Sequence, residues 1–140
     1  MTNTQFNFLS GQLLGACIEV HKQLGLGLLE SVYEYSLMTE FFLRNINAKN
    51  KIGIPLIYKG INTGKVFEID ILIENEIVVE LKTVEILDPE FTAQLITYLK
   101  LAGKRLGFFI NFNVPLLKNG FKRFVNNLLI PRLSASAVKN

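Results

Sequence analysis

The stretch of residues 65–82, KVFEIDILIENEIVVELK, constrains the fold of this chain more than any other segment. Two apolar runs rich in β-branched residues flank a polar turn at 74–76, and this pattern predicts a β-hairpin of two buried strands. An ionised carboxylate inside an apolar strand is costly in free energy unless a partner or a ligand compensates its charge. Asp70 and Glu80 interrupt these strands, so both carboxylates need such a partner.

The length of the hairpin loop decides which residues face each other. With a three-residue loop at 74–76, counting back from the turn places Asp70 opposite Glu80. Directly opposed side chains share a face, with Cβ atoms about 4.5–5.5 Å apart, and strand alternation sends Lys82 to the same face. Two carboxylates at this distance repel each other, and a divalent cation relieves the repulsion. A solvated or mutually paired cluster at a sheet edge is the alternative interpretation, and a two-residue loop would shift the register.

Two helices are predicted before the hairpin. Apolar residues recur at helical spacing over residues 4–24, and Gly25 and Gly27 then end that helix. A second helix is predicted over residues 28–44. Its expected buried side consists of Leu29, Val32, Tyr33, Leu37 and Phe41.

The segment 51–59 is predicted to be a strand. Because it contains Pro55, which cannot donate a ladder hydrogen bond, an edge or bulged strand is expected. A turn at 60–64 leads from this strand into the hairpin.

After the hairpin, Asp88 followed by Pro89 predicts the start of a helix that ends at Gly103. Residues 105–112 then form another buried strand, expected to run parallel to the strand that ends at Lys82 because a helical crossover joins them. A final short helix or irregular segment is expected to reach about residue 130.

The composition indicates an ordinary globular protein of one domain. The chain has 140 residues, of which 49% are hydrophobic and 19% charged, and the tail 134–140 is expected to fray. A net charge of +3 permits a nucleic-acid partner without requiring one. The one cysteine, Cys17, fits a reducing compartment. The chain has no membrane-spanning run and no basic secretory leader, so we expect a cytoplasmic location.

The order helix, helix, three strands, helix, strand resembles the PD-(D/E)xK nuclease superfamily, with its restriction-endonuclease-like αβββαβ core. More narrowly, GLGLLESVYE at 25–34 resembles the signature of the GxxExxY protein family, here Gly27, Glu30 and Tyr33. The resemblance covers about residues 17–125. Besides the signature, it is carried by Val20-His21-Lys22, Asp70, Glu80-x-Lys82, Gln94-Leu95, Tyr98-Leu99, Gly107 to Phe112 and Lys122-Arg123.

The resemblance implies an α/β fold with a mixed central sheet flanked by helices and an extra N-terminal helix. It also implies a metal site for Mg²⁺ or Mn²⁺, held by Asp70, Glu80 and the backbone carbonyl of Leu81. In similar enzymes a lysine in the place of Lys82 orients or deprotonates the metal-bound water. Glu30 would approach from the second helix as a third acid.

Further polar residues could contact the substrate. Gln94 and Tyr98 are four residues apart on one helical face, where they could bind a phosphate, a metal water or Lys82, although Tyr98 also continues the apolar stripe. A basic rim for the phosphate backbone could consist of Lys100, Lys104, Arg105, Lys118, Lys122 and Arg123. A plain solvated surface is the alternative for these six residues.

The leading hypothesis is therefore a Mg²⁺-dependent nuclease that cleaves DNA or RNA. A second hypothesis is a nucleic-acid-binding module without catalysis, which is favoured by Glu68, because family members often carry a basic residue two positions before the aspartate. A third hypothesis is a protein-interaction subunit, such as a homodimer formed through the apolar segment Phe121 to Ile130.

Overall fold

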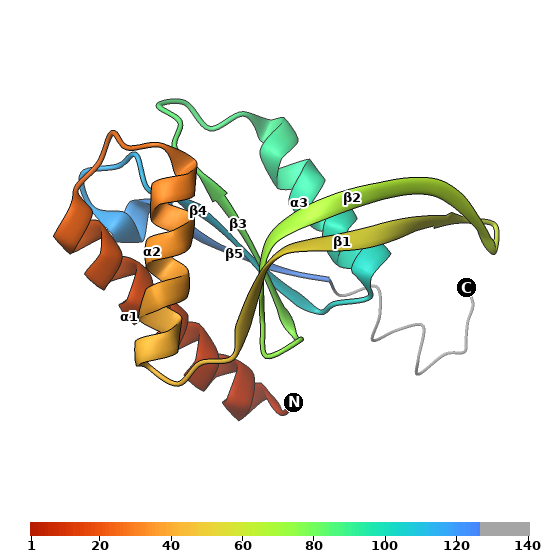
Figure 1. Ribbon diagram of the computed structural model, residues 1–140, viewed down its shortest axis with the longest axis horizontal. Helices are drawn as coiled ribbons and strands as arrows, with labels where there is room; N and C mark the ends of the chain where they lie inside the picture. The colour runs from red at the N-terminus through yellow and green to blue at the C-terminus, as the bar shows by residue number, and fades with distance from the viewer. Residues whose placement is uncertain (127–140) are drawn as a thin grey trace.

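The computed structural model describes residues 1–126, which form a five-stranded mixed sheet in the order β1-β2-β3-β4-β5 with helices on both faces (Figure 1). Strands β3 and β4 are parallel, and the other neighbouring pairs are antiparallel. The elements in chain order are α1 (Asn3–Leu24), α2 (Glu30–Leu43), β1 (Ala48–Tyr58), β2 (Ile61–Ile73), β3 (Ile77–Lys82), α3 (Pro89–Ala102), β4 (Leu106–Asn111), the 3₁₀ turn η1 (Leu117–Gly120) and β5 (Phe121–Val125).

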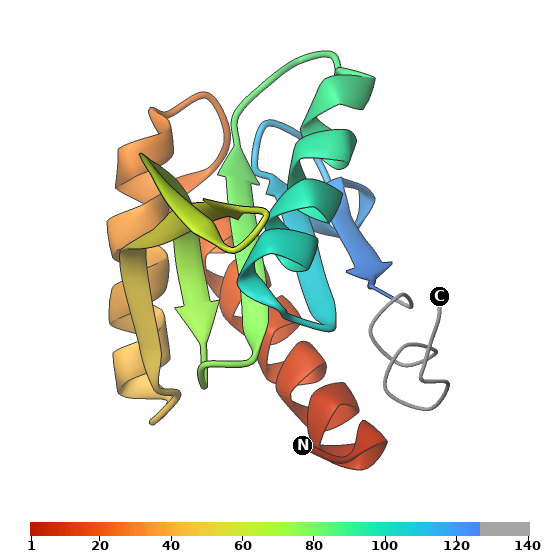
Figure 2. The same ribbon diagram turned by 90° about the vertical axis from the view of Figure 1, so that its right-hand side faces the viewer.

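The sheet separates two apolar layers, as Figure 2 shows from the side. Helices α1 and α2 pack on one face, and their layer includes Leu13, Tyr33 and Phe108. Helix α3 packs on the other face through Leu95 and Leu99. Burial of both faces explains why β3 and β4 are almost wholly apolar, because a strand covered on both sides has no solvent-facing positions.

This architecture confirms the predicted fold class, including the extra N-terminal helix. The predicted hairpin register is also confirmed, because Ile73 pairs with Ile77 across a three-residue loop. Strand β4 is parallel to β3, as the helical crossover requires. Strand β1 lies at the sheet edge and its register shifts just after Pro55, as the proline predicted.

The turn predicted at 60–64 was placed wrongly. Tyr58 pairs with Ile61, so the turn consists of only Lys59 and Gly60, and β2 begins directly after it. Both turn residues have positive φ, 50° and 78°, which is typical of the tight two-residue hairpin turns that match the twist of the strands. The consequence is a long β1–β2 ribbon that extends beyond the helical layers in Figure 1.

The prediction for the segment after β4 was also wrong in part. Residues 121–125 form β5, a fifth strand antiparallel to β4, rather than a helix or an irregular segment. Two adjacent basic residues in FKRFV hide the strand pattern, and an edge strand needs apolar contacts on only part of its length. Phe121 packs against Phe108 at a ring-centroid distance of 4.8 Å, so it belongs to the core rather than to a free apolar surface. The rest of the proposed interface, to Ile130, and the tail 134–140 lie outside the described residues.

The buried side of α2 is narrower than predicted. Leu29 precedes the helix and is 75% exposed, and Val32 is also exposed. Tyr33, Leu37 and Phe41 are buried as expected. The run of apolar residues at 28–29 therefore belongs to the loop before α2 and not to its core stripe.

Cys17 lies on the buried side of α1 with no exposed surface. Burial raises the pKa of its thiol far above the ordinary value, because the thiolate would lose its hydration. The cysteine therefore packs as a small apolar residue, as its position on the helical stripe predicted. Within residues 1–126, no helix has the length and hydropathy needed to cross a membrane.

A steric test of the C-terminal part of the sheet is the substitution Gly120→Ala. A Cβ atom at Gly120 would overlap the carbonyl oxygen of Asn111, the last residue of β4. We expect Gly120→Ala to lower the free energy of unfolding by about 1–3 kcal/mol, measured by urea denaturation. Gly11→Ala is the matched control, since space around Gly11 in α1 is open and this change should stabilise the protein by about 0.5–1 kcal/mol. Equal stabilities of the two variants would contradict the close approach.

Candidate active site

The two carboxylates of the hairpin are held by each other's strands. The β2–β3 ladder pairs end at Ile71 with Val79, one step before Asp70. Beyond that pair, the backbone N–H of Asp70 donates to Glu80 Oε2 at 2.9 Å, and the N–H of Leu81 donates to Asp70 Oδ2 at 2.8 Å. The structure thus brings Asp70 and Glu80 together across the strands, with side chains in the place of ladder hydrogen bonds.

Strand β2 changes its orientation at Asp70. Ile69 packs in the layer of α3, whereas Ile71, two residues on, packs in the layer of α1 and α2, although strand alternation would send both to one face. On the other side of β2, the ladder with β1 skips the position where Lys51 faces Asp70, and Lys51 has a φ of 54°. Asp70 therefore lies where the ladders on both sides of β2 are interrupted.

Burial controls the protonation of this carboxylate pair. Glu80 is only 7% exposed, and burial, together with the nearby charge of Asp70, raises its pKa to about 8. The N–H of Asp70 and the ammonium of Lys82 act in the opposite direction. Burial likewise raises the pKa of Asp70, against the hydrogen bond from Leu81. The pair therefore resists holding two negative charges unless a cation is present.

Lys82 lies beside an open cavity on the α3 side of the sheet. Its Nζ atom is 4.7 Å from the ring centroid of Phe91. The cavity has a volume of about 470 Å³ and is lined by Lys82, Glu90, Phe91, Ala93, Gln94 and Thr97. The structure thus places Gln94 in the same cavity as Lys82.

Tyr98 does not line this cavity. Its ring stacks on Phe67 of β2 at a centroid distance of 4.8 Å. The charges of Glu80 and Asp70 nevertheless add to burial in raising the pKa of the Tyr98 hydroxyl, so the phenol is near the carboxylates. Tyr98 therefore packs in the core and also lies close to the site. The sequence had left open whether it does one or the other.

Glu30 lies in the exposed first turn of α2. Its charge raises the pKa values of both Asp70 and Glu80, so it is close enough to act on the site electrostatically. Among residues 1–126, however, no three side chains of His, Cys, Asp or Glu are grouped so that they could hold a metal ion together. The carboxylates that converge are Asp70 and Glu80, without Glu30.

Glu34 is a residue that sequence reasoning missed. It is buried, and its Oε2 atom accepts hydrogen bonds from Lys51 Nζ at 3.0 Å and Asn50 Nδ2 at 2.9 Å. These bonds fix α2 to the kinked part of β1 that faces Asp70. The sequence could have indicated this residue, because Glu34 follows Glu30 by one helical turn and so lies on the same side of α2.

The predicted basic rim is not assembled around the site. Lys104 donates to the carbonyl of Asn75 in the hairpin turn, and the guanidinium of Arg105 lies over the ring of Phe6. Because β4 runs parallel to β3, its start lies beside the hairpin turn, at the opposite end of the sheet from Lys82. Lys104 and Arg105 therefore do not adjoin the carboxylates, and their contact with a phosphate backbone stays a prediction.

The other basic residues of the predicted rim are dispersed. Lys100 is exposed in the last turn of α3, and Lys118 is exposed in η1. Lys122 faces the α3 side of the sheet and lines a second cavity of about 250 Å³ that also includes Asn111. Arg123 pairs with Phe108 and so points to the opposite face from Lys122. These residues do not form one continuous surface.

Glu68 does not add its charge to the carboxylate pair. It is exposed, and it pairs with Gly53 of β1. Since the orientation of β2 changes at Asp70, Glu68 and Asp70 lie on different sides of the sheet despite their spacing of two. The argument from Glu68 against a catalytic site is correspondingly weaker.

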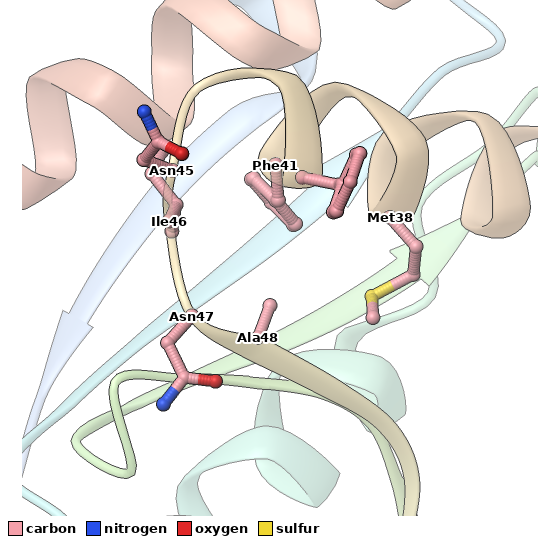
Figure 3. A pocket seen from close by; sticks show the side chains of 7 residues that line it. Met38, Phe41, Asn45, Ile46, Asn47 and Ala48 are labelled. Atoms are coloured by element: carbon pink, nitrogen blue, oxygen red, sulfur yellow. The ribbon is translucent and has the colours of Figure 1, made fainter.

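A separate hollow of about 460 Å³ lies at the end of α2 (Figure 3). Its lining is Met38, Phe41, Phe42, Asn45, Ile46, Asn47 and Ala48, with no charged or nucleophilic group. Since Ala48 pairs with Ile73, the hollow lies at the hairpin-turn end of β2. It has the volume of a ligand pocket but no group that could carry out a reaction.

The residues around Asp70 fit a hard divalent cation. Within residues 1–126, the hydrogen bonds to the carboxylates engage only Asp70 Oδ2 and Glu80 Oε2, which leaves one oxygen of each for a metal ion. Mg²⁺ is typically bound by one or two carboxylates together with waters and substrate phosphate oxygens, so two acids are sufficient.

This fold agrees with the comparison to known proteins. Residues 7–124 match the PD-(D/E)XK nuclease superfamily, and the chain belongs to that superfamily. PD-(D/E)XK nucleases generally use divalent metals, and membership points to nucleic acid as the substrate class. The narrower GxxExxY family stays a prediction.

Among solved structures, the chain is similar to SSO0001, known from a crystal structure, with 16% sequence identity and a TM-score of 0.44. That match covers 83% of this chain and 76% of SSO0001. No curated protein matches the chain.

The raised pKa of Glu80 predicts how stability depends on pH without metal. Between pH 4.5 and about 8, the folded chain retains a proton at Glu80 that the unfolded chain releases, so the free energy of unfolding should fall as pH rises through this range. Glu80→Gln removes the effect and can still accept the N–H of Asp70. In EDTA, we expect this variant to exceed wild type by roughly 2–4 kcal/mol at pH 8.5 and to match it near pH 4.5, measured by urea denaturation.

Glu76→Gln, in the hairpin turn, is the matched control for the loss of one acid. It should follow the wild-type pH dependence. If Glu80→Gln and wild type had parallel stability curves from pH 4.5 to 8.5, Glu80 would not be the buried group that titrates.

Proposed function

We propose that the chain is a single PD-(D/E)xK nuclease domain of the GxxExxY family, and that it hydrolyses phosphodiester bonds of nucleic acid with Mg²⁺ or Mn²⁺. The observation that carries the proposal is the pair Asp70 and Glu80, bonded to each other's strands beside Lys82 and an open cavity. A buried acid pair of this kind is unfavourable for a purely structural role, because each charge costs free energy that a binding function can offset.

Each residue of the site has a separate role in the proposed reaction. Asp70, Glu80 and the carbonyl of Leu81 would hold the cation, which supplies a nucleophilic water and stabilises negative charge on the phosphate. The Leu81 N–H fixes the orientation of Asp70, and the Asp70 N–H fixes that of Glu80. Neither carboxylate therefore has to reorganise when the cation binds, and this preorganisation favours catalysis.

Lys82 is suited to act on the attacking water and the phosphate. Its ammonium lies near Glu80, whose pKa it lowers, and over the face of Phe91, where a cation is favoured. Its role is to orient the water and to stabilise charge in the transition state.

Three further residues complete the site. Gln94 shares the cavity with Lys82 and can donate hydrogen bonds to a phosphate oxygen. Tyr98, near the carboxylates, can donate its hydroxyl proton in a hydrogen bond to a metal-bound water. Glu30 contributes negative charge from α2, which favours cation binding by Asp70 and Glu80.

A nucleic-acid-binding module without turnover is the second candidate. The observation in its favour is that only two carboxylates converge in the described part of the chain, with Glu30 outside the group. Such a module could bind a cation and a phosphate without activating water. Binding without metal-dependent cleavage would identify it.

The proposed activity is tested directly by cleavage. Purified wild type should cut DNA or RNA in Mg²⁺ or Mn²⁺ and not in EDTA, with products resolved by gel electrophoresis. Asp70→Asn and Lys82→Met should each lower the cleavage rate by about 10²-fold or more, because one removes a metal ligand and the other the charge beside the water.

Lys49→Met is the control for loss of a lysine, since Lys49 is exposed on β1. It should retain wild-type activity. Thermal unfolding of every variant verifies that it is folded. Cleavage that survives both Asp70→Asn and Lys82→Met would remove these residues from the mechanism.

Metal binding has a readout that does not depend on cleavage. At pH 7.5, Mg²⁺ at ten times its Kd should stabilise wild type by about 1.4 kcal/mol and so raise Tm by about 3–5 °C. The shift should be absent in Asp70→Asn and should weaken in wild type as pH falls, since protonated Glu80 cannot bind the ion. An equal Mg²⁺ shift in wild type and Asp70→Asn would place the metal elsewhere.

A further inference from the structure

The ribbon formed by β1 and β2 continues past the body of the protein. We call residues 53–66 the arm. Figure 1 shows the arm crossing α3 and extending beyond the helices, and Figure 2 shows it in front of the sheet. Residues 57–66, which include the tip, are all exposed. A projecting two-stranded ribbon gains little stability from the core, so its length calls for a functional reason.

The arm is positively charged and carries exposed apolar side chains. It contains Lys59 and Lys65 and no Asp or Glu. Tyr58 and Ile61, which pair on either side of the turn, are 62% and 70% exposed. Lysines next to apolar tip residues suit a polyanion that presents charge at its backbone and apolar surface in its groove.

The arm is attached rigidly to the candidate site. Strand β2 carries both Lys65 and Asp70, so no flexible joint separates them. At the base of the arm, Phe67 stacks on Tyr98 of α3 and fixes the direction in which the ribbon leaves the body. At about 3.3 Å per residue, Lys65 is about 17 Å from Asp70 and the tip residue Ile61 about 30 Å. At 3.4 Å per base, that reach corresponds to about nine base pairs.

We propose that the arm binds the major groove of B-form duplex DNA and holds the duplex along the line from the tip to Asp70. The proposal rests on the nuclease function and names its substrate class as duplex DNA. The major groove of B-form DNA admits a two-stranded β-ribbon, whereas that of A-form RNA is too narrow and deep. Lys59 and Lys65 would contact phosphates on the groove walls, and the exposed residues Asn62 and Thr63, which lie between them in the sequence, would approach base edges.

A second copy of this chain is a poorer occupant for the arm. A symmetric dimer formed by two arms would bring four lysines together without an acidic residue of the arm to compensate them. Repulsion of this kind disfavours self-association and favours an anionic partner.

The test compares two double variants of the full chain. The arm variant is Lys59→Ala with Lys65→Ala, and the control is Lys22→Ala with Lys49→Ala, two exposed lysines on α1 and the body of β1. Binding to a 30-base-pair duplex is measured in EDTA by fluorescence anisotropy at several salt concentrations. We expect the arm variant to lose about tenfold or more in affinity, with a log–log salt slope lower by up to about two. The control should lose much less.

Cleavage separates the arm from the chemical site. On duplex DNA, the arm variant should raise KM with kcat little changed, because it removes binding that is equal in ground and transition states. With bis(4-nitrophenyl) phosphate, a substrate too small to reach the arm, the arm variant should have the same hydrolysis rate as wild type. Lys59→Arg with Lys65→Arg should restore duplex binding, since charge is retained.

Each result decides a separate point. Equal duplex affinity of the arm and control variants would overturn the proposal, and so would an equal loss for duplex RNA. Light scattering that showed a wild-type dimer dissociated by the arm substitutions would assign the arm to self-association instead. DNA binding that depends on the arm, without any cleavage by wild type, would support the proposal for the arm and reject the nuclease function. Failure of the arm proposal and failure of the nuclease function therefore give different results.

Discussion

The reciprocal hydrogen bonds between Asp70 and Glu80 and the backbone of each other's strand are the constraint on which the site depends. Two acids within a sheet buried on both sides would normally separate the strands or be replaced by apolar residues. Here each carboxylate accepts an N–H that the ladder leaves free, which offsets part of the cost of burial. The remaining cost appears as the raised pKa values of both groups. The carboxylate pair is therefore expected to bind a cation, and it lies in a rigid part of the fold.

The surrounding elements stabilise this arrangement from both layers. On the α2 side, the buried Glu34 pairs with Lys51, the residue of β1 that faces Asp70 with a positive φ. On the α3 side, Lys82 lies over Phe91 and next to Gln94. The carboxylates are therefore at the junction of two helices and three strands, with fixed contacts on both sides. Preorganisation of this kind is what a metal-dependent reaction requires.

Much of this could be predicted from the sequence because the decisive information was local. The three-residue loop determined the register that places Asp70 near Glu80, and Pro55 marked the edge strand. The change of orientation at Asp70 could not be predicted, since period-two alternation assumes a regular strand. Strand β5 was missed because two adjacent basic residues interrupt its apolar pattern. The dispersed placement of the basic residues could not be predicted either, since spacing along the chain does not tell which end or face of the sheet a residue occupies.

The burial of Cys17 has a practical consequence for studying this protein. With its thiol inaccessible and its pKa raised, the native cysteine is a poor target for maleimide reagents. A cysteine introduced on the exposed ribbon would then be the preferred attachment point for a fluorophore or spin label, without prior removal of Cys17. The natural sequence therefore gives little labelling at other positions. Distance changes between a labelled ribbon and a labelled oligonucleotide could then be followed in real time.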